Sequence, residues 1–355
     1  MGYLLGNAVY SRILEEVLVE SGVTTVPLRL SEAEYDHPAP RWAMIGQTPR
    51  CAYQHRRLLR ESALDPLEFD ALVFQTYHAA IPYGDVLNAR PGVLALDSTP
   101  ALDWRRNSMR PARLTGRARR GLGKAVGDHM VRKAFGRMRH FFAWSEAVKA
   151  SLMHDYGVPE SRIEVTYVPV PSVTPRRFER AAVPRMLFVG NDFVRKGGPD
   201  LVRVFDERFA DRADLIVVSR DAARHVDFSR TRAQHLSGLS RSEVVELMRS
   251  CDLFVFPSES DALGIVLLEA LKCGLPVVAK DSGSQAELVK DGLNGMLLAN
   301  DAPRSALAEA LERMLSNPEQ LASMGRASLS IAEKIWDRDQ LASRLLAVLQ
   351  SAVEY

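Results

Sequence analysis

Residues 257–295 read PSESDALGIVLLEALKCGLPVVAKDSGSQAELVKDGLNG, and this stretch decides the fold. The run 253–258 (LFVFPS) predicts a buried strand, and the pattern over 264–272 predicts a helix that follows it. The apolar run 276–280 (PVVAK) predicts the next strand. Buried strands that alternate with helices favour a parallel sheet covered by helices on its faces.

One acidic residue stands inside this otherwise apolar helix. Glu269 follows Ile265, Val266, Leu267 and Leu268, and an ionised carboxylate that is buried costs several kcal/mol unless it is paired or hydrogen-bonded. A structural salt bridge would satisfy it, and so would the two vicinal hydroxyls of a ribose. At the start of the helix, Gly264 and the free backbone N–H groups would let an anion approach closely.

The same alternation extends to both sides of this stretch. In the C-terminal half it predicts strands over 185–190, 215–219, 253–258 and 276–280, and helices over 199–209, 242–250 and 264–272. In the N-terminal half a short apolar run at 2–5 precedes a helix over 9–20, strands are predicted over 71–75, 93–97, 140–145 and 163–171, and a helix over 146–156. We therefore expect an α/β protein of two Rossmann-like, doubly wound parallel-sheet domains that face each other across a cleft.

The boundary between the two domains is marked by composition. Residues 169–184 (PVPSVTPRRFERAAVP) contain four prolines, several charges and little apolar content, which is typical of a linker. We expect an N-terminal domain over 1–170 and a second domain over 183–330. From Pro303 to the end, the sequence has the pattern of amphipathic helices.

The stretch 257–295 resembles the donor-site signature of retaining GT-B glycosyltransferases of family 4, in which two acidic residues flank seven others. Here they are Asp261 and Glu269, written D-ALGIVLL-E, where the family usually has glutamate first. The resemblance implies that Glu269 binds the ribose of a nucleotide sugar and that Asp261 contacts the transferred sugar. It further implies that N–H groups of the helix start contact the sugar and diphosphate, at Leu263, Gly264, Ile265 and Val266. It also implies that the helix over 331–355, around Trp336, crosses back to the first domain.

A second match to this family is FVGNDFVRKGGPDLV (188–202). The resemblance implies that Gly190 and Asn191 border the donor, with Asn191 where the family usually has arginine. Arg195 and Lys196 would stabilise the negative charge that develops on a diphosphate leaving group. The implied reaction moves a sugar from a nucleotide-diphosphate sugar to an acceptor hydroxyl with retention of configuration. UDP-, GDP- and ADP-sugars all remain open as donors, and no metal or other cofactor is required.

The N-terminal half resembles the family less. In LALDSTPALDW (94–104), Asp97 stands where relatives often carry a histidine that faces the sugar. Its carboxylate could shield an oxocarbenium-like centre or bind an acceptor hydroxyl, but Asp-Ser-Thr-Pro is also helix-cap chemistry. Tyr77, His78 and Thr99 are further acceptor-side candidates, although a lone histidine at a strand end is more often structural. Gly6 is expected in a loop between the first strand and the first helix.

The chain has a net charge of +2, which conceals a strongly basic region. Between residues 105 and 140 twelve basic residues stand against one acid, Asp128, a local balance of +11. Such a field attracts anionic lipid, a phosphorylated acceptor or nucleic acid, unless acids elsewhere in the fold balance it. Because no aromatic residue lies between Arg105 and Phe135, nucleic acid is not expected as a partner.

The remaining composition argues against several other classes of protein. No run approaches the roughly 18 to 20 apolar residues that cross a bilayer, so a cytoplasmic protein is expected, with peripheral contact at the inner membrane face through 105–140. Three scattered cysteines disfavour a disulfide framework or a zinc site. Two alternatives remain open: a sugar-nucleotide epimerase or hydrolase of GT-B-like fold, and a non-catalytic nucleotide-sugar binding protein.

Overall fold

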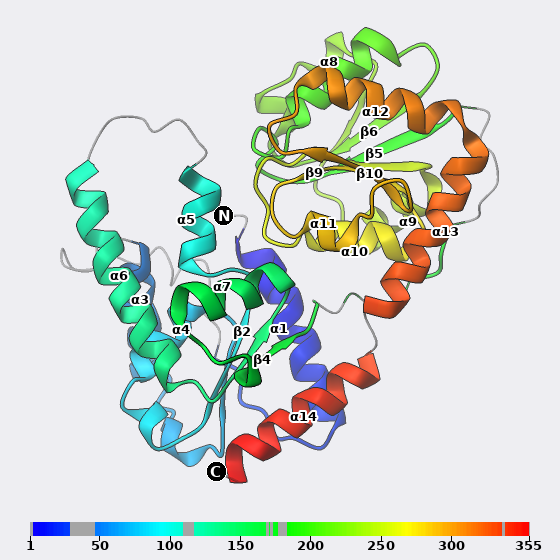
Figure 1. Ribbon diagram of the computed structural model, residues 1–355. Helices are drawn as coiled ribbons and strands as arrows, with labels where there is room; N and C mark the ends of the chain where they lie inside the picture. Colours follow the sequence, from blue (N-terminus) through cyan, green and yellow to red (C-terminus); the bar gives the residue numbers. More distant parts are fainter. Residues whose placement is uncertain are drawn as a thin grey trace. The chain divides into compact units, whose positions relative to one another are not determined.

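The computed structural model describes residues 3–28, 47–108, 117–167, 170, 173–176, 183–335 and 338–354. The chain divides into two compact units (Figure 1). The N-terminal unit consists of Asn7–Tyr167 and Arg338–Tyr355, and the C-terminal unit consists of Val168–Asp337 together with Met1–Gly6. The last helix of the chain therefore belongs to the N-terminal unit, although the C-terminal unit precedes it in sequence.

Parallel strands form the centre of the N-terminal unit. Its elements are α1 (Tyr3–Glu20, which belongs to this unit from Asn7 onward), α3 (Gln47–Glu61), β1 (Leu72–Phe74), α4 (Tyr77–Ala80), β2 (Gly92–Leu96), α5 (Pro100–Ser108), α6 (Arg117–Arg137), β3 (His140–Ala143), α7 (Glu146–Tyr156), β4 (Ile163–Val165) and α14 (Arg338–Glu354). The described strands form a four-stranded parallel sheet in the order β1-β2-β3-β4. Because the strands are parallel, the loops that follow β1, β2 and β3 meet at one edge of the sheet.

The prediction of a first strand at residues 2–5 is wrong. Residues 3–5 are the first residues of α1, which begins at Tyr3, so Gly6 lies inside a helix and not in a loop. Gly2 lies outside the described residues. An apolar run of four residues fits a helix as well as a strand. The dipeptide Gly6-Asn7 does not end a helix by itself, and α1 runs through it. The prediction for 163–171 is also too long, since β4 ends at Val165 before two prolines that lack an N–H. Residues 168, 169 and 171 lie outside the described residues.

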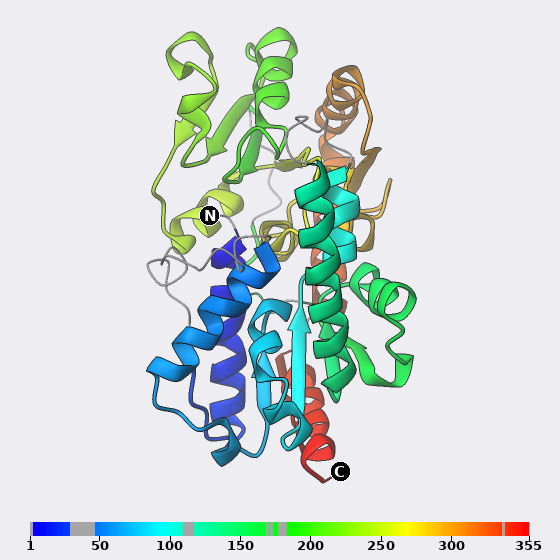
Figure 2. The ribbon, with the colours of Figure 1, turned by 90° about the vertical axis from the view of Figure 1, so that its left-hand side faces the viewer.

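Helices α6 and α14 help to bury the core of the N-terminal unit. Val131 and Phe135 of α6, and Met138 directly after the helix, belong to one buried cluster with Leu94 and Phe141 of the sheet. Figure 2 shows the course of α6. In α14 the side chains Leu341, Leu345, Leu349 and Ala352 are buried, at the spacing of one helix face. The Nε of Arg344, on the same helix, lies 3.2 Å from Oε1 of Glu164 in β4.

The C-terminal unit has a larger parallel sheet. Its elements are β5 (Arg185–Val189), α8 (Gly198–Arg208), β6 (Asp214–Val218), β7 (Gln234–Leu236), α9 (Arg241–Ser250), β8 (Leu253–Phe256), α10 (Ile265–Lys272), β9 (Val277–Asp281), α11 (Gln285–Leu288), β10 (Gly295–Ala299), α12 (Arg304–Ser316) and α13 (Pro318–Ile335). The described strands run in the order β10-β9-β8-β5-β6-β7, and every pair is parallel. In Figure 1, α8 and α12 lie on one face of this sheet and α9, α10 and α11 on the other. The doubly wound architecture predicted from the alternating pattern is therefore confirmed.

Two edge strands of this sheet were missed in the sequence. β7 is only three residues long and contains a glutamine and a histidine, so it lacks an apolar run. β10 begins at Gly295 inside the stretch that was interpreted as part of the donor signature. A Cβ at Gly295 would stand 1.9 Å from the carbonyl oxygen of Val277, so glycine permits the close pairing of β10 with β9.

An ion pair fixes the described end of the linker to the C-terminal unit. Arg176 NH2 lies 2.5 Å from Oδ1 of Asp252, and both side chains are buried. The other carboxylate oxygen of Asp252 accepts the backbone N–H of Arg185 at 2.9 Å. A buried pair of this kind is costly to break, because each partner left alone is an uncompensated charge.

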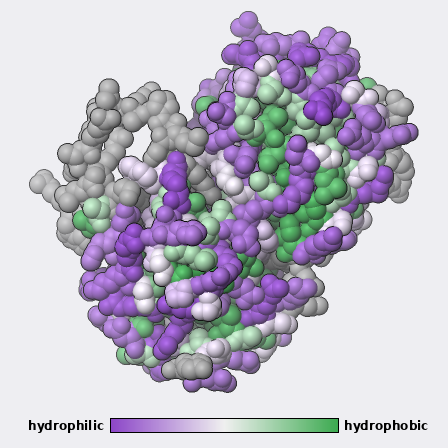
Figure 3. Space-filling model, in the orientation of Figure 1, coloured by the Kyte–Doolittle hydropathy of each residue, from purple (hydrophilic) through white to green (hydrophobic). Residues whose placement is uncertain are grey.

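Apolar side chains are largely internal in both units. In the view of Figure 3, hydrophobic residues appear as strips between hydrophilic ones. Across the described residues, none of the helices combines the length and the apolar character that a membrane span requires.

Candidate active site

The strand order places a binding edge in the C-terminal unit. β5 lies between β8 and β6, so the chain leaves β5 toward one side of the sheet and returns through β8 on the other. In open α/β sheets, ligands bind outside the carboxyl ends of the strands at such a switch point. The loops that follow β5 and β8 are residues 190–197 and 257–264, which contain most of the predicted donor-site residues.

Two glycines allow these loops to approach each other. A Cβ at Gly190 would lie 2.4 Å from Cδ of Lys196, so the absence of a side chain makes room for the lysine stem. Gly197 has φ +74°, and a Cβ there would lie 2.4 Å from the carbonyl oxygen of Pro257 in the other loop. The N–H of Glu259 donates to the carbonyl of Arg195 at 3.1 Å. The two loops are thus joined through backbone contacts.

The side chains of the two loops form an ion cluster. Nζ of Lys196 lies 2.7 Å from Oδ2 of Asp261, and NH1 of Arg195 lies 3.8 Å from the same oxygen. Arg195 also donates to the carbonyl of Ser260 and, at 2.5 Å, to the carboxylate of Asp192. Lys196 and Arg195 thus face two carboxylates, those of Asp192 and Asp261, and the four charges of this cluster balance.

The environment keeps Asp261 ionised. Burial by itself would raise the pKa of this carboxyl, but the ammonium of Lys196, the guanidinium of Arg195 and the N–H of Ala262 more than offset it. The pKa of Asp261 is therefore lowered below its ordinary value. Only 17% of the aspartate side chain and 14% of the lysine side chain are exposed, so the pair is weakly screened by solvent.

The start of α10 lies beside this cluster. Gly264 precedes the helix with φ +73°, and no side chain caps the helix N-terminus. Its would-be Cβ lies 3.2 Å from the ring of Phe256, and the same ring has the ammonium of Lys196 at 5.0 Å from its centroid. The helix start and the lysine therefore contact one aromatic ring. Both favour negative charge, the helix through its dipole and through the N–H groups of Ile265 and Val266, which have no acceptor within the helix.

Glu269 lies further along α10 and has a protein partner. Its Oε1 is 2.6 Å from NH2 of Arg241, the first residue of α9. Burial raises the pKa of Glu269, and the nearby guanidinium of Arg241 offsets only part of this effect. Sequence analysis missed Arg241. The motif Ser240-x-x-Glu243 signals that a helix starts there, but nothing in the pattern indicates that its first side chain reaches Glu269.

The remaining predicted donor-site residues are placed as follows. Leu263 is buried, and Ile265 and Val266 are half-buried at the first turn of α10. Asn191 is uncharged and cannot replace the arginine that the family usually has here. Its Oδ1 accepts the backbone N–H of Arg220 at 3.1 Å. It thereby connects the loop after β5 to the loop after β6.

The acceptor-side candidates belong to the N-terminal unit. The hydroxyl of Tyr77 donates to Oδ2 of Asp103 at 3.3 Å, and Ser98 donates to Oδ1 of the same residue at 2.7 Å. Burial and the carboxylates of Asp103 and Asp97 raise the pKa of Tyr77 well above its ordinary value. These groups therefore gather where β1 and β2 end. Asp103 was not predicted as a site residue. Its position in the first turn of the helix after the loop that follows β2 is the feature of the sequence that could have indicated it.

Two acceptor-side predictions are corrected by the structure. Thr99 is fully buried, and its Oγ1 caps α5 through the N–H of Leu102 at 3.2 Å and lies 2.6 Å from the hydroxyl of Ser151. It is a structural cap and has no exposed hydroxyl for an acceptor. Gly6 lies within α1, as described above. A buried threonine at a helix start is explained by capping chemistry alone.

His78 is a buried neutral histidine. It packs against Tyr77 with ring centroids 4.0 Å apart. Burial, and to a smaller extent the neighbouring His55, lower the pKa of His78 to about 3. At neutral pH the imidazole is therefore uncharged and holds no acidic proton to give to a leaving group.

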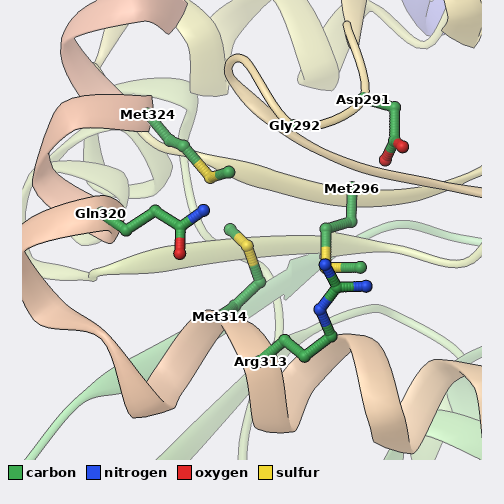
Figure 4. Close-up of a pocket in the computed structure, with 7 residues that line it drawn as sticks. All are labelled: Asp291, Gly292, Met296, Arg313, Met314, Gln320 and Met324. Carbon is green, nitrogen blue, oxygen red and sulfur yellow. The ribbon is translucent and has the colours of Figure 1, made fainter.

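A separate cavity lies away from these residues. It is lined by Asp291, Gly292, Met296, Arg313, Met314, Gln320 and Met324, between β10, α12 and α13 (Figure 4). The cavity holds about 80 Å³, whereas sites for ligands of drug size usually enclose roughly 300–1,000 Å³. It is too small for a nucleotide sugar. Among the described residues, no group of three or more His, Cys, Asp or Glu side chains is arranged to hold a metal ion.

Comparison with known sequences identifies the C-terminal unit. Residues 183–330 match the family model of glycosyl transferases group 1. A GDP-mannose-dependent monoacylated alpha-(1-6)-phosphatidylinositol monomannoside mannosyltransferase of Corynebacterium glutamicum is 28% identical over 171 residues, 44% of this chain and 44% of that protein. A D-inositol 3-phosphate glycosyltransferase of Segniliparus rotundus is 35% identical over 113 residues, 32% of this chain and 24% of that protein. The chain thus aligns with less than half the length of these curated relatives.

Comparison with solved structures covers nearly the whole chain. Sucrose-phosphate synthase from Thermosynechococcus elongatus superimposes with a TM-score of 0.72 at 14% identity, over 97% of this chain and 92% of that one. Anabaena HepE in complex with UDP and glucose gives a TM-score of 0.69 at 16% identity, over 99% and 97% of the two chains. At these identities the likeness concerns the fold alone. The protein therefore has the GT-B fold, and its residues 183–330 match the family model of glycosyl transferases group 1.

Proposed function

We propose that this protein is a glycosyltransferase that transfers a sugar from a nucleoside-diphosphate sugar to an acceptor hydroxyl, with retention of the anomeric configuration. The observation that carries the proposal is the position of Lys196 beside the uncapped start of α10, at the switch point of a doubly wound sheet. The match of the same unit to glycosyl transferases group 1 supports it.

The chemistry follows from where the charges lie. As the bond between the anomeric carbon and the diphosphate oxygen breaks, negative charge grows on the diphosphate. Lys196, Arg195 and the N–H groups at the start of α10 are placed to stabilise that charge without further reorganisation. The acceptor oxygen bonds to the same face of the anomeric carbon, and its proton passes to the departing diphosphate. No cofactor is required in this scheme.

The other site residues bind and orient. Glu269 accepts the ribose hydroxyls, and the amides from Leu263 to Val266 bind the sugar and diphosphate. Asp261 holds Lys196 until a donor arrives and then contacts the sugar, one methylene further away than a glutamate would. In the N-terminal unit, Asp97 and Tyr77 lie close enough for the carboxylate to raise the pKa of the phenol, and we assign them to the acceptor side.

The nucleotide and the acceptor are also proposals. A relative uses GDP-mannose according to its name, and a structural neighbour binds UDP. The proposed donor is therefore a nucleoside-diphosphate sugar, and an assay has to decide whether its nucleotide is UDP, GDP or ADP. The curated relatives act on a phosphatidylinositol mannoside and on inositol 3-phosphate according to their names. Both acceptors are anionic, in keeping with the positive charge of residues 105–140 in this chain.

We further propose that the basic region contacts an anionic membrane surface on the cytoplasmic side. Trp104 of α5 precedes Arg105 in the sequence and is 49% exposed. Lys133, in the last turns of α6, and Arg139, just after that helix, are also exposed. A tryptophan beside basic residues is typical of a membrane interface. Sedimentation with phosphatidylglycerol vesicles tests this: Trp104→Ala and Lys133→Glu should each reduce the bound fraction, and equal binding to neutral vesicles would contradict the proposal.

Two other functions compete with transfer. An epimerase or hydrolase would need an acid and a base in the N-terminal unit, and His78 is unsuited because its pKa of about 3 keeps it neutral. A non-catalytic binding protein is favoured by one observation, namely that Asp261 already neutralises Lys196 at 2.7 Å. The two functions differ in whether the nucleotide sugar is consumed.

The test is an NMR assay of UDP-, GDP- and ADP-sugars with the full chain, with and without polyol and inositol-phosphate acceptors. Transfer predicts release of nucleoside diphosphate and a product with the anomeric configuration of the donor. Inverted product would overturn retention alone. Binding without any release of nucleoside diphosphate would establish the binding protein instead.

A further inference from the structure

Arg241 occupies a rigid position at the start of α9. The hydroxyl of Ser240 accepts the N–H of Glu243 at 3.3 Å, and the carboxylate of Glu243 accepts the N–H of Ser240 at 2.7 Å. This capping box fixes the first turn of the helix and therefore the backbone of Arg241. Since α9 packs against α10, the side chain of Arg241 is directed from a fixed base toward Glu269.

The ion pair between Arg241 and Glu269 is recorded at one carboxylate oxygen, Oε1. NH2 of Arg241 lies 2.6 Å from Oε1, while a carboxylate has two oxygens with about four acceptor positions. In the described part of the chain, no other group is seen to donate to Oε2. The glutamate side chain is 11% exposed, so a small part of it is open to a ligand.

Burial makes this carboxylate dependent on its partner. Glu269 lies among apolar residues of α10, and burial raises its pKa despite the nearby guanidinium. Lys272, one turn further along α10, donates to the carbonyl of Val170 at 2.8 Å. The guanidinium of Arg241 favours the charged form of Glu269, and a charged acceptor forms stronger hydrogen bonds than a neutral one.

We propose that Arg241 is a positioning residue for nucleotide recognition. It fixes the orientation and charge of Glu269 so that Oε2 accepts the hydroxyls of a ribose, which makes Arg241 a determinant of the preference for ribonucleotides over 2′-deoxyribonucleotides. This inference rests on the proposed function, because it assumes that a nucleoside diphosphate binds beside α10.

The test compares four proteins: the wild type, Arg241→Met, Arg241→Lys and Arg249→Met. The last is a matched control, since Arg249 lies on the same helix and pairs with Glu246 at 2.7 Å. Titration calorimetry measures the dissociation constants of UDP, GDP and ADP and of their 2′-deoxy forms. The ratio of the deoxy to the ribo constant is the readout, because a general loss of stability would change both constants together.

For the nucleotide that binds the wild type, we expect the dissociation constant of the 2′-deoxy form to be roughly tenfold or more that of the ribo form. The 2′-deoxy form lacks the hydroxyl that donates a hydrogen bond to the charged Glu269. Arg241→Met should reduce the ratio to about twofold or less, Arg241→Lys should restore part of it, and Arg249→Met should leave it unchanged. An unchanged ratio in both Arg241 variants would overturn this inference and leave the proposed function intact. Failure of the wild type to bind any of the three nucleotides would refute the proposed function, and this inference with it.

Discussion

At the level of single residues, the ion pair between Lys196 and Asp261 joins the two loops of the proposed donor site. The lysine and aspartate were both predicted as donor-site residues from their motifs, but their mutual contact at 2.7 Å could not be predicted. It depends on Gly190 and Gly197, which allow the lysine stem and the loop backbones to approach within contact distance. A sequence pattern specifies residue types and spacing, whereas the pairing of charges depends on the tertiary approach of two loops.

Asp261→Asn should strengthen the binding of a nucleoside diphosphate while it slows transfer. The aspartate both neutralises Lys196 and repels a diphosphate, so removal of its charge should tighten binding by about fivefold, or about 1 kcal/mol. Calorimetric titration of the wild type, Asp261→Asn and the charge-conserving Asp261→Glu checks this. Weaker binding in the Asn variant than in the Glu variant would show that the carboxylate itself binds the ligand.

The same pair predicts a dependence of stability on pH. The folded-state pKa of Asp261 is lowered below the unfolded value of about 3.9, so the pair stabilises the fold above that pH. This contribution is lost as the pH falls through the folded pKa. In Lys196→Met the aspartate is buried without its lysine, which should cost about 3 kcal/mol at pH 7. Thermal unfolding should show the difference between the proteins shrinking below about pH 4, and a constant difference would contradict this.

At the scale of elements, the periodicity of the sequence predicted most of the C-terminal sheet. β5, β6, β8 and β9 are apolar runs within a residue or two of their predicted bounds. The strands that escaped prediction, β7 and β10, are at the two edges of the sheet, where burial on both faces is not required and the apolar pattern weakens. Helix α7, by contrast, agrees at both ends because Ser145 caps its start and Gly157 its end.

Gly197→Ala tests the junction of the two loops. Its positive φ costs a non-glycine residue about 1 to 2 kcal/mol, and the added Cβ would also meet a backbone carbonyl at 2.4 Å. Gly292→Ala is the matched control, since its φ is +74° but nothing lies within 4 Å of the added Cβ. Urea unfolding should show a larger loss of stability for Gly197→Ala, with weaker nucleotide binding in that variant alone. Equal losses of stability in the two variants would mean that the loops after β5 and β8 can move apart without destabilising the fold.

At the scale of the whole molecule, the chain returns to its first unit through α14. The predicted return of residues 331–355 came from the family resemblance and not from any pattern in the tail, and Trp336 itself lies outside the described residues. The helix begins at Arg338 and buries Leu341, Leu345 and Leu349. Amphipathic periodicity predicts that a helix has a buried face, but it does not say which unit the face covers.

Leu345→Ala should therefore weaken the N-terminal unit and spare the C-terminal one. The leucine is fully buried, and its truncation should cost about 2 to 5 kcal/mol. Hydrogen exchange followed by mass spectrometry should show faster exchange in β2 and β3, with β5 and β8 unchanged. Leu315→Ala, at a partly buried leucine of α12, is the counterpart for the other unit. Faster exchange in β5 or β8 of the Leu345 variant would contradict the division into units.

Binding of a diphosphate by the loops after β5 and β8 can be tested without an acceptor or a known sugar. Calorimetric titration compares UDP, GDP and ADP with their parent nucleosides, on the wild type and on Lys196→Met. We predict that one diphosphate binds the wild type at least tenfold more tightly than its nucleoside, and that Lys196→Met abolishes this difference. If the diphosphate has the same advantage in both proteins, or if none of the three binds the wild type, the account is contradicted.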